Sequence, residues 1–237
     1  MMNKTLTALL MGSVLLCAGC DGSSQKLNDV IGQAQRTPDA WQGLQQLQKE
    51  ADALDVRTFS NLFQDPVTEG KTYQDAYFGL FKKALAQGRT PALVSLFSRP
   101  NLSDLKQQYV GVLVSQAEHA AGDKQDAALL STAGDLFAQG NWAVTDSARA
   151  AGYYARAWLA GDKKAPRDLY NLFAAQRDYP SAYLWGIRCI GDCYYGTNQA
   201  LTTDVRSNLT PAQIVMVQRL AKDRRVITVN GLGAKDK

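Results

Sequence analysis

An internal repeat constrains the fold of this chain more than any other feature. In residues 80–96 a large residue is followed, at steps of four, by Ala, Gly, Ala and Leu, and residues 153–169 carry the same pattern 73 positions later. A repeat unit of this kind cannot bury its apolar face alone and has to stack on a neighbour. The offset is about two units of the 34–40-residue class of helical repeats. The sequence therefore predicts an all-α fold, an α-solenoid of stacked helix pairs, and such stacks usually bind other molecules.

The N-terminal residues have the composition of an export signal. An apolar run over residues 6–16 is too short to span a bilayer and has the length of a secretory signal. The run leads into Ala18-Gly19-Cys20, which resembles the bacterial lipoprotein signal, although Cys17 stands where that family usually carries Leu. The resemblance implies that the thiol of Cys20 receives a diacylglycerol and that Cys20 becomes the first residue. An ordinary signal peptide, cut near Ala18, is the alternative.

The same resemblance predicts where the protein resides. It implies a signal peptide over residues 1–19 and a lipidated Cys with a polar, flexible tether over residues 20–36. Several acyl chains on one Cys give stable membrane attachment. Asp21 resembles the signal that retains lipoproteins of enteric-type bacteria at the inner membrane. We therefore expect a protein of the cell envelope that faces the periplasm, with the inner membrane favoured over the outer.

Cysteine usage agrees with export. Once Cys17 leaves with the signal and Cys20 carries lipid, Cys189 and Cys193 are the remaining thiols in an oxidising compartment, so a disulfide is expected. A helical spacing of four places two Cα atoms about 6 Å apart, within disulfide range. Two free thiols are the alternative. A zinc site would need further ligands, and the spacing is not that of a Cys-x-x-Cys redox pair.

Local signals predict most of the helices. Thr37 and Pro38 are suited to open one helix, whereas residues 65–71 have the composition of a loop. Thr210 and Gln213 form a capping-box pattern around Pro211. Further helices are expected over residues 73–87, 91–97, 103–122, 128–139 and 147–160, with Asp146 as a cap and Gly140 and Gly161 as stops.

The second half of the chain resembles Sel1-like repeats, which are related to tetratricopeptide repeats. The residues that carry the resemblance are Gly134, Asp135, Gly140, Asp146, Ala150, Tyr153, Tyr154, Ala157 and Gly161, then Asp178, Ala182 and Trp185 at the same spacing, and the segment Leu209-Thr210-Pro211-Ala212-Gln213. The resemblance implies divergent helical repeats over residues 37–125, Sel1-like repeats with a capping helix over residues 126–223, and a flexible tail over residues 224–237. It also implies a concave binding surface, but it names no partner.

Aromatic residues supply the candidate binding positions. Most, such as Tyr153 and Trp185, fall at helical positions and are expected in the core. Trp142 lies between two predicted helices, and Tyr194 and Tyr195 follow the Cys pair, so these three are the candidate partner-binding residues.

Residue patterns of catalysis are not evident in the sequence. His119 is the single histidine, and neither a Gly-x-Ser-x-Gly elbow nor a phosphate-binding loop occurs. A net charge of +4 is too small to argue for a nucleic-acid partner. We expect a protein that is not an enzyme, has no cofactor, catalytic or metal-ligating residue, and binds another protein.

Three functional hypotheses follow. The first is a lipid-anchored periplasmic scaffold that holds a component of an envelope complex. The second is an immunity protein that neutralises a phospholipase effector of a type VI secretion system, a role that some Sel1-like lipoproteins have. The third, an enzyme, is disfavoured.

Overall fold

The computed structural model describes residues 22–53, 66–193 and 199–229. Within these ranges the regular structure is entirely helical, so the expected all-α class is confirmed for them. The chain divides into two compact units, Met1–Arg89 and Thr90–Lys237. The signal peptide, Cys20, Asp21, Tyr194 and Tyr195 lie outside the described residues. None of the described helices combines the length and apolar character that crossing a bilayer requires.

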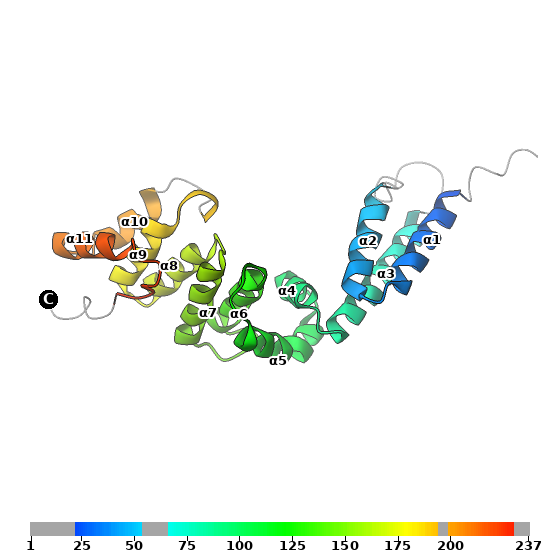
Figure 1. The fold of residues 1–237 in the computed structure, drawn as a ribbon, viewed down its shortest axis with the longest axis horizontal. Helices are drawn as coiled ribbons and strands as arrows, with labels where there is room; N and C mark the ends of the chain where they lie inside the picture. Colours follow the sequence, from blue (N-terminus) through cyan, green and yellow to red (C-terminus); the bar gives the residue numbers. More distant parts are fainter. Residues whose placement is uncertain (1–21, 54–65, 194–198, 230–237) are drawn as a thin grey trace, which may run out of the picture. The chain divides into compact units, whose positions relative to one another are not determined.

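The described part of the first unit contains three helices, which pack against one another (Figure 1). They are α1 (Gly22–Arg36), α2 (Ala40–Ala53) and α3 (Pro66–Ala86). Two expectations fail here. Residues 22–36 form α1 and not a tether, because Leu27, Ile31 and Ala34 recur at helical spacing and are buried within the unit. Residues 66–71, expected as a loop, form the first turns of α3, where Pro66 occupies a position that suits proline.

The start of α2 differs from the prediction in its cap. Asp39, not Thr37, caps this helix, because its Oδ1 accepts the main-chain N–H groups of Trp41 (3.0 Å) and Gln42 (3.3 Å). Thr37 instead ends α1, since its hydroxyl donates to the carbonyl oxygen of Gln33 at 3.2 Å. Two potential capping residues lie two positions apart, and the bend between α1 and α2 decides which one is used.

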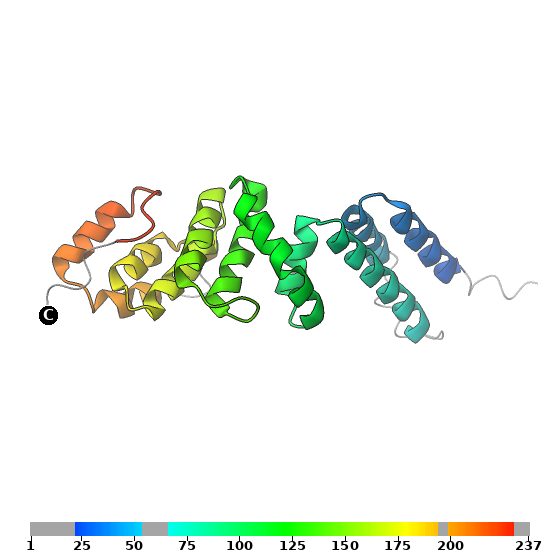
Figure 2. The same ribbon diagram turned by 90° about the horizontal axis from the view of Figure 1, so that it is seen from below.

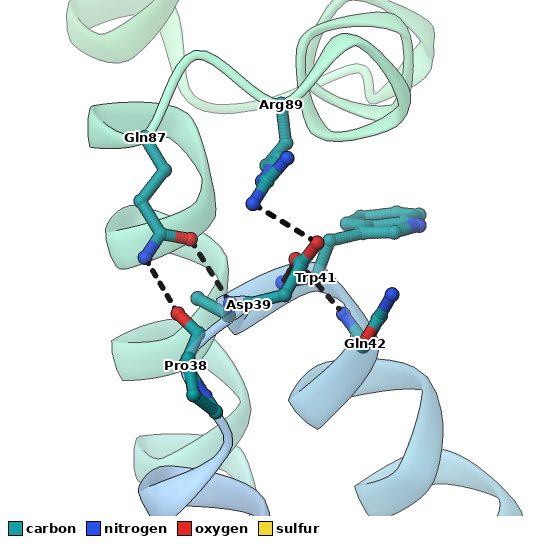
Figure 3. A network of polar contacts seen from close by, with 7 residues as sticks. Pro38, Asp39, Trp41, Gln42, Gln87 and Arg89 are labelled. Carbon is teal, nitrogen blue, oxygen red and sulfur yellow. Dashed lines mark hydrogen bonds and ion pairs between the residues drawn. The ribbon is translucent and has the colours of Figure 1, made fainter.

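A polar network fastens this corner to the end of α3 (Figure 3). The side chain of Gln87 bridges the corner: Nε2 donates to the carbonyl oxygen of Pro38, and Oε1 accepts from the N–H of Ala40, both at 2.9 Å. Arg89 lies 3.1 Å from the carboxylate of Asp39. The helix α3 is therefore tied through side chains to the cap of α2.

The second unit contains eight described helices; consecutive helices pack together from α4 to α10, and α11 packs on α9 (Figure 2). They are α4 (Thr90–Ser98), α5 (Ser103–His119), α6 (Ala127–Gln139), α7 (Ser147–Ala160), α8 (Ala165–Ala175), α9 (Tyr179–Arg188), α10 (Gln199–Arg206) and α11 (Pro211–Leu220). Short 3-10 turns lie at Lys124–Asp126 and Gly191–Cys193. One copy of the internal repeat lies in α7 and α8 of this unit, whereas the other is divided between α3 and α4, which belong to different units.

Several predicted helix ends in this unit are confirmed. The carboxylate of Asp146 accepts the N–H of Arg149 at 2.9 Å and caps α7. Gly161 ends the same helix with φ 102°, a left-handed conformation that glycine adopts without steric cost. Thr210 and Gln213 form the expected capping box at the start of α11.

The cysteine pair lies at disulfide distance, as expected. The sulfur atoms of Cys189 and Cys193 are 2.02 Å apart, and their Cα atoms are 5.2 Å apart. The setting differs from the helical spacing that was assumed, because α9 ends at Arg188 and Cys193 lies in the following 3-10 turn. The pair therefore joins the end of α9 to the turn that succeeds it.

The predicted flexible tail does not hold for residues 224–229. This segment lies on α9, and Val229 is 5% exposed. Trp185 donates its indole N–H to the carbonyl oxygen of Ile227 at 2.8 Å, and Arg188 donates to that of Val226 at 2.7 Å. The composition of this segment predicts a loose tail. The contact leaves no local signal in the sequence, because the partners of these main-chain atoms belong to a helix some forty residues earlier.

Candidate functional site

A groove with a volume of about 770 Å³ lies in the second unit, between α5 and the loop that joins α6 to α7. Its size is within the range of known ligand sites. The groove is open to solvent, and it contains Trp142, one of the three residues that the sequence suggested for partner binding.

One wall of the groove is a single face of α5. Val110, Val114 and Glu118 follow one another at steps of four, and Gly111 and Ser115 lie beside them. Gly111 is exposed, and a Cβ built at this position would meet nothing within 4 Å. The wall therefore combines two valines with the polar side chains of Ser115 and Glu118, and it has free space at Gly111, where a side chain is absent.

The base of the groove is aromatic. The ring of Phe137 stacks on that of Tyr153, with centroids 5.7 Å apart and planes 8° from parallel. The guanidinium of Arg149 lies 4.2 Å from the centroid of Phe137 and also pairs with the carboxylate of Glu118 on α5. Both charged side chains are more than 40% exposed, so the pair contributes little stability. It neutralises the charges at this rim of the groove.

The remaining wall is the loop after α6. Trp142 is half-buried, and the ammonium of Lys106 lies 5.6 Å from the centroid of its indole ring. Lys106 is itself buried, and it donates to the carbonyl oxygen of Arg99. Val144, in contrast, is 89% exposed at the edge of the groove. The loop therefore has one anchored aromatic residue and one aliphatic residue directed to solvent.

Two contacts hold the loop in place. Gly140 ends α6 with φ 72°, and its Cα lies against the side chain of Thr145. A Cβ at this position would collide with the hydroxyl oxygen of Thr145. The N–H of Asp146 donates to the carbonyl oxygen of Phe137 at 3.0 Å, which closes the loop at its far end. Gly140 and Asp146 thus position Trp142, whereas the sequence pattern predicts only that they end and begin helices.

A second cluster of polar groups lies between α6, α7 and α8. The hydroxyl of Tyr154 donates to the carboxylate of Asp135 at 2.7 Å, and Ser131 donates to Asp162. Burial, together with the negative charges of Asp135 and Asp162, raises the pKa of Asp168 to about 6. Burial is also the main cause that raises the pKa of Asp135.

This cluster offers no sign of a metal site. Across the part of the chain that the structure describes, no group of three or more His, Cys, Asp or Glu side chains is arranged to hold a metal ion. The carboxylates instead repel one another across the helix interfaces, which affects stability and not ligand binding.

Sequence reasoning missed most of the groove. The positions Val110, Gly111 and Val114 belong to a helix that was expected, but nothing in the sequence indicates that this face lies opposite Trp142. The pair of Arg149 and Glu118 is 31 residues apart in sequence and is formed only by packing. The spacing of four along α5 was the one available signal, and it also fits a buried face.

Comparison with known proteins gives no relative for this chain. No protein-family model matches it, and neither a curated protein nor a solved structure is similar to it.

Proposed function

We propose that this protein is a non-catalytic, lipid-anchored scaffold of Sel1-like repeats on the periplasmic side of the cell envelope, and that its groove binds a segment of another protein. The observation that carries the proposal is the groove itself: an open depression with Val110 and Val114 on its α5 wall, the buried ring of Phe137 at its base and an exposed Val144 at its edge. Exposed apolar residues gathered around a depression are typical of binding sites.

The lining favours an apolar segment of a protein over a charged ligand. Arg149 and Glu118 satisfy each other, and the ammonium of Lys106 is covered by the ring of Trp142. Neither cation is therefore presented to an anion. A partner side chain that fills the space above Gly111 would bury the partly exposed side chains of Val110 and Val114, and burial of apolar area contributes about 25 cal/mol per Å².

The proposal is tested by filling the groove. Gly111→Leu places a side chain in open space, so it is expected to block the groove and leave the fold intact. Gly152→Leu is the matched control, because Gly152 is also an exposed helical glycine with nothing within 4 Å of a built Cβ, and it lies outside the groove. Circular dichroism and thermal unfolding would verify that both variants fold.

The readout is a photo-crosslinking residue at position 144, introduced into the lipoprotein in its native cells. We expect a discrete cross-linked protein that is lost with Gly111→Leu and kept with Gly152→Leu. Identification of that protein distinguishes an envelope component from a secreted effector. Equal cross-linking in both variants would contradict a role for the groove.

A further inference from the structure

One face of α9 binds the main chain of a neighbouring segment, and this contact is separate from the groove. Ser181, Trp185 and Arg188 follow one another along α9 at steps of four and three, so they lie on one face. The N–H of Val229 donates to the hydroxyl oxygen of Ser181 at 2.9 Å, and the indole of Trp185 donates to the carbonyl oxygen of Ile227 at 2.8 Å.

Arg188 makes the larger part of the contact. Its guanidinium donates to the main-chain carbonyl oxygens of Asp223 (2.6 Å), Val226 (2.7 Å) and Ala221 (3.4 Å). The guanidinium also lies 4.6 Å from the centroid of the Trp185 ring. Arg188 is 8% exposed, and burial lowers the pKa of its guanidinium. A buried cation is thus neutralised by carbonyl dipoles of the segment that follows α11.

All five of these hydrogen bonds end on main-chain atoms of residues 221–229. Main-chain atoms are common to every peptide, so this face recognises the course of a backbone, with turns over residues 221–225 and an extended stretch over residues 226–229. Among the charged side chains, Asp223 and Arg225 pair with each other at 3.0 Å and Arg225 is 86% exposed, whereas Arg224 donates to the carbonyl oxygen of Trp158 at 3.2 Å. The buried aliphatic side chain of Val229 adds an apolar anchor.

We propose that this face of α9 is a binding site for a peptide in which a turn leads into an extended aliphatic stretch, and that residues 221–229 fill it as a displaceable occupant. The fitting partner has β-branched residues where this chain has Val226, Ile227 and Val229. Such a segment offers carbonyl oxygens to Trp185 and Arg188 and an N–H to Ser181. The chain's own segment competes with it at the high effective concentration that a covalent connection provides.

Local opening makes the exchange physically reasonable. Residues 222–229 follow the C-cap of α11 and contain no regular helix, so their release breaks side-chain bonds and a few main-chain turn bonds and leaves the hydrogen bonds within the helices in place. Segments of this type open with a smaller free energy than the helices on which they lie.

The decisive probe is a fluorescently labelled synthetic peptide with the sequence of residues 221–229, added to the full chain. Val229→Pro removes the N–H that donates to Ser181, and it therefore weakens the binding of the chain's own segment to α9. Arg225→Ala is the matched control, because its side chain is exposed and makes none of the five bonds. We expect the peptide to bind Val229→Pro at least tenfold more tightly than it binds the wild type or Arg225→Ala.

Arg188→Lys in the Val229→Pro background should abolish this binding, since the single nitrogen of an ammonium cannot take the places of the three guanidinium nitrogens that each donate to a different carbonyl oxygen. A folded Val229→Pro variant that does not bind the peptide would overturn the proposal. Hydrogen exchange of the wild type gives a second measurement, which does not depend on any variant folding. The amide of Val229 should exchange at least a hundredfold faster than the buried amides of α9, and equal protection would show that the segment opens only with the whole protein.

Discussion

The ring of Tyr154 lies against the backbone of Gly134, so closely that a Cβ at position 134 would be 2.5 Å from two of its ring carbons. The hydroxyl of the same tyrosine donates to the neighbouring Asp135 at 2.7 Å. This contact brings α6 and α7 together, and the two helices carry Phe137 and Arg149 of the groove. The shape of the groove therefore depends on a glycine that is not part of its lining.

Gly134→Ala is expected to destabilise the protein by about 1–3 kcal/mol, because the added methyl group has to displace a buried ring. The direction of the change in the free energy of unfolding is informative, because alanine by itself stabilises a helix by about 1 kcal/mol relative to glycine. Gly152→Ala, where the space is open, should stabilise the protein by up to about 1 kcal/mol. Urea unfolding measures both changes, and stabilisation at both positions would refute the close contact of α6 and α7.

Asp168 is expected to make stability decrease as the pH rises. Its pKa is about 6 in the folded protein and 3.8 in the reference state, so the folded protein binds this proton more tightly. The resulting stabilisation is complete below pH 3.8 and is lost as the pH rises through about 6. Asp168→Asn should therefore be more stable than the wild type at pH 7.5, by about 2–3 kcal/mol.

Urea unfolding at pH 4.5 and pH 7.5 is the measurement for this prediction. Asp204→Asn is a suitable control, because Asp204 is exposed on α10 and is not part of the cluster around Asp135. The free energies of unfolding of the two variants should differ at pH 7.5. If Asp168→Asn and Asp204→Asn have the same pH dependence, burial and the neighbouring carboxylates do not raise the pKa of Asp168.

Gln87→Ala is expected to lower the free energy of unfolding of the first unit by about 1–3 kcal/mol, since the carbonyl of Pro38 and the N–H of Ala40 both lose a partner. Arg89→Ala removes only a partly exposed ion pair with Asp39 and should cost less than about 1 kcal/mol. Denaturant unfolding followed by the fluorescence of Trp41 compares the two. The opposite order would mean that the ion pair, and not the amide bridge, holds the corner.

Cys20→Ser is expected to abolish lipidation and to release the protein from membranes, because the thiol is the acceptor of the diacylglycerol in the proposed signal. Metabolic labelling with a fatty-acid analogue and membrane fractionation test this directly. Cys17→Ser is the control, since the resemblance places that residue in the part that is cleaved. Persistent labelling of Cys20→Ser would leave an ordinary signal peptide as the better hypothesis.

Cys189 and Cys193 are expected to resist alkylation in unreduced protein and to react after reduction. Mass spectrometry of alkylated peptides detects both states. Loss of the bond by replacing both residues with serine should cost less than about 3 kcal/mol, the value for a 15-residue loop, because this loop is much shorter. Alkylation of both thiols in freshly exported, unreduced protein would contradict the pairing.

Local chemistry made some of this structure predictable. A cap needs only a few consecutive residues, which is why Asp146, Gly161 and Thr210 could be assigned to helix ends before the structure was known. The buried positions of Tyr153 and Trp185 followed in the same way from helical spacing. These features depend on neighbours within one or two helical turns.

Features that join distant residues could not be predicted in this way. Residues 22–36 have a polar composition, and their helix is stabilised by burial of Leu27 and Ile31 inside the first unit. Residues 224–229 resemble a loose tail until their main-chain atoms meet Trp185 and Arg188.

The sequence by itself determined the helical class, the ends of several helices and the pairing of Cys189 with Cys193, because each depends on spacing or on residue type over a short stretch. Only the tertiary structure decided that Gly111 faces Trp142 across a groove and that α9 holds an extended segment. The physical reason is that side-chain directions along one helix are set by its own periodicity, whereas the helix that comes to lie opposite is set by the packing of the whole unit.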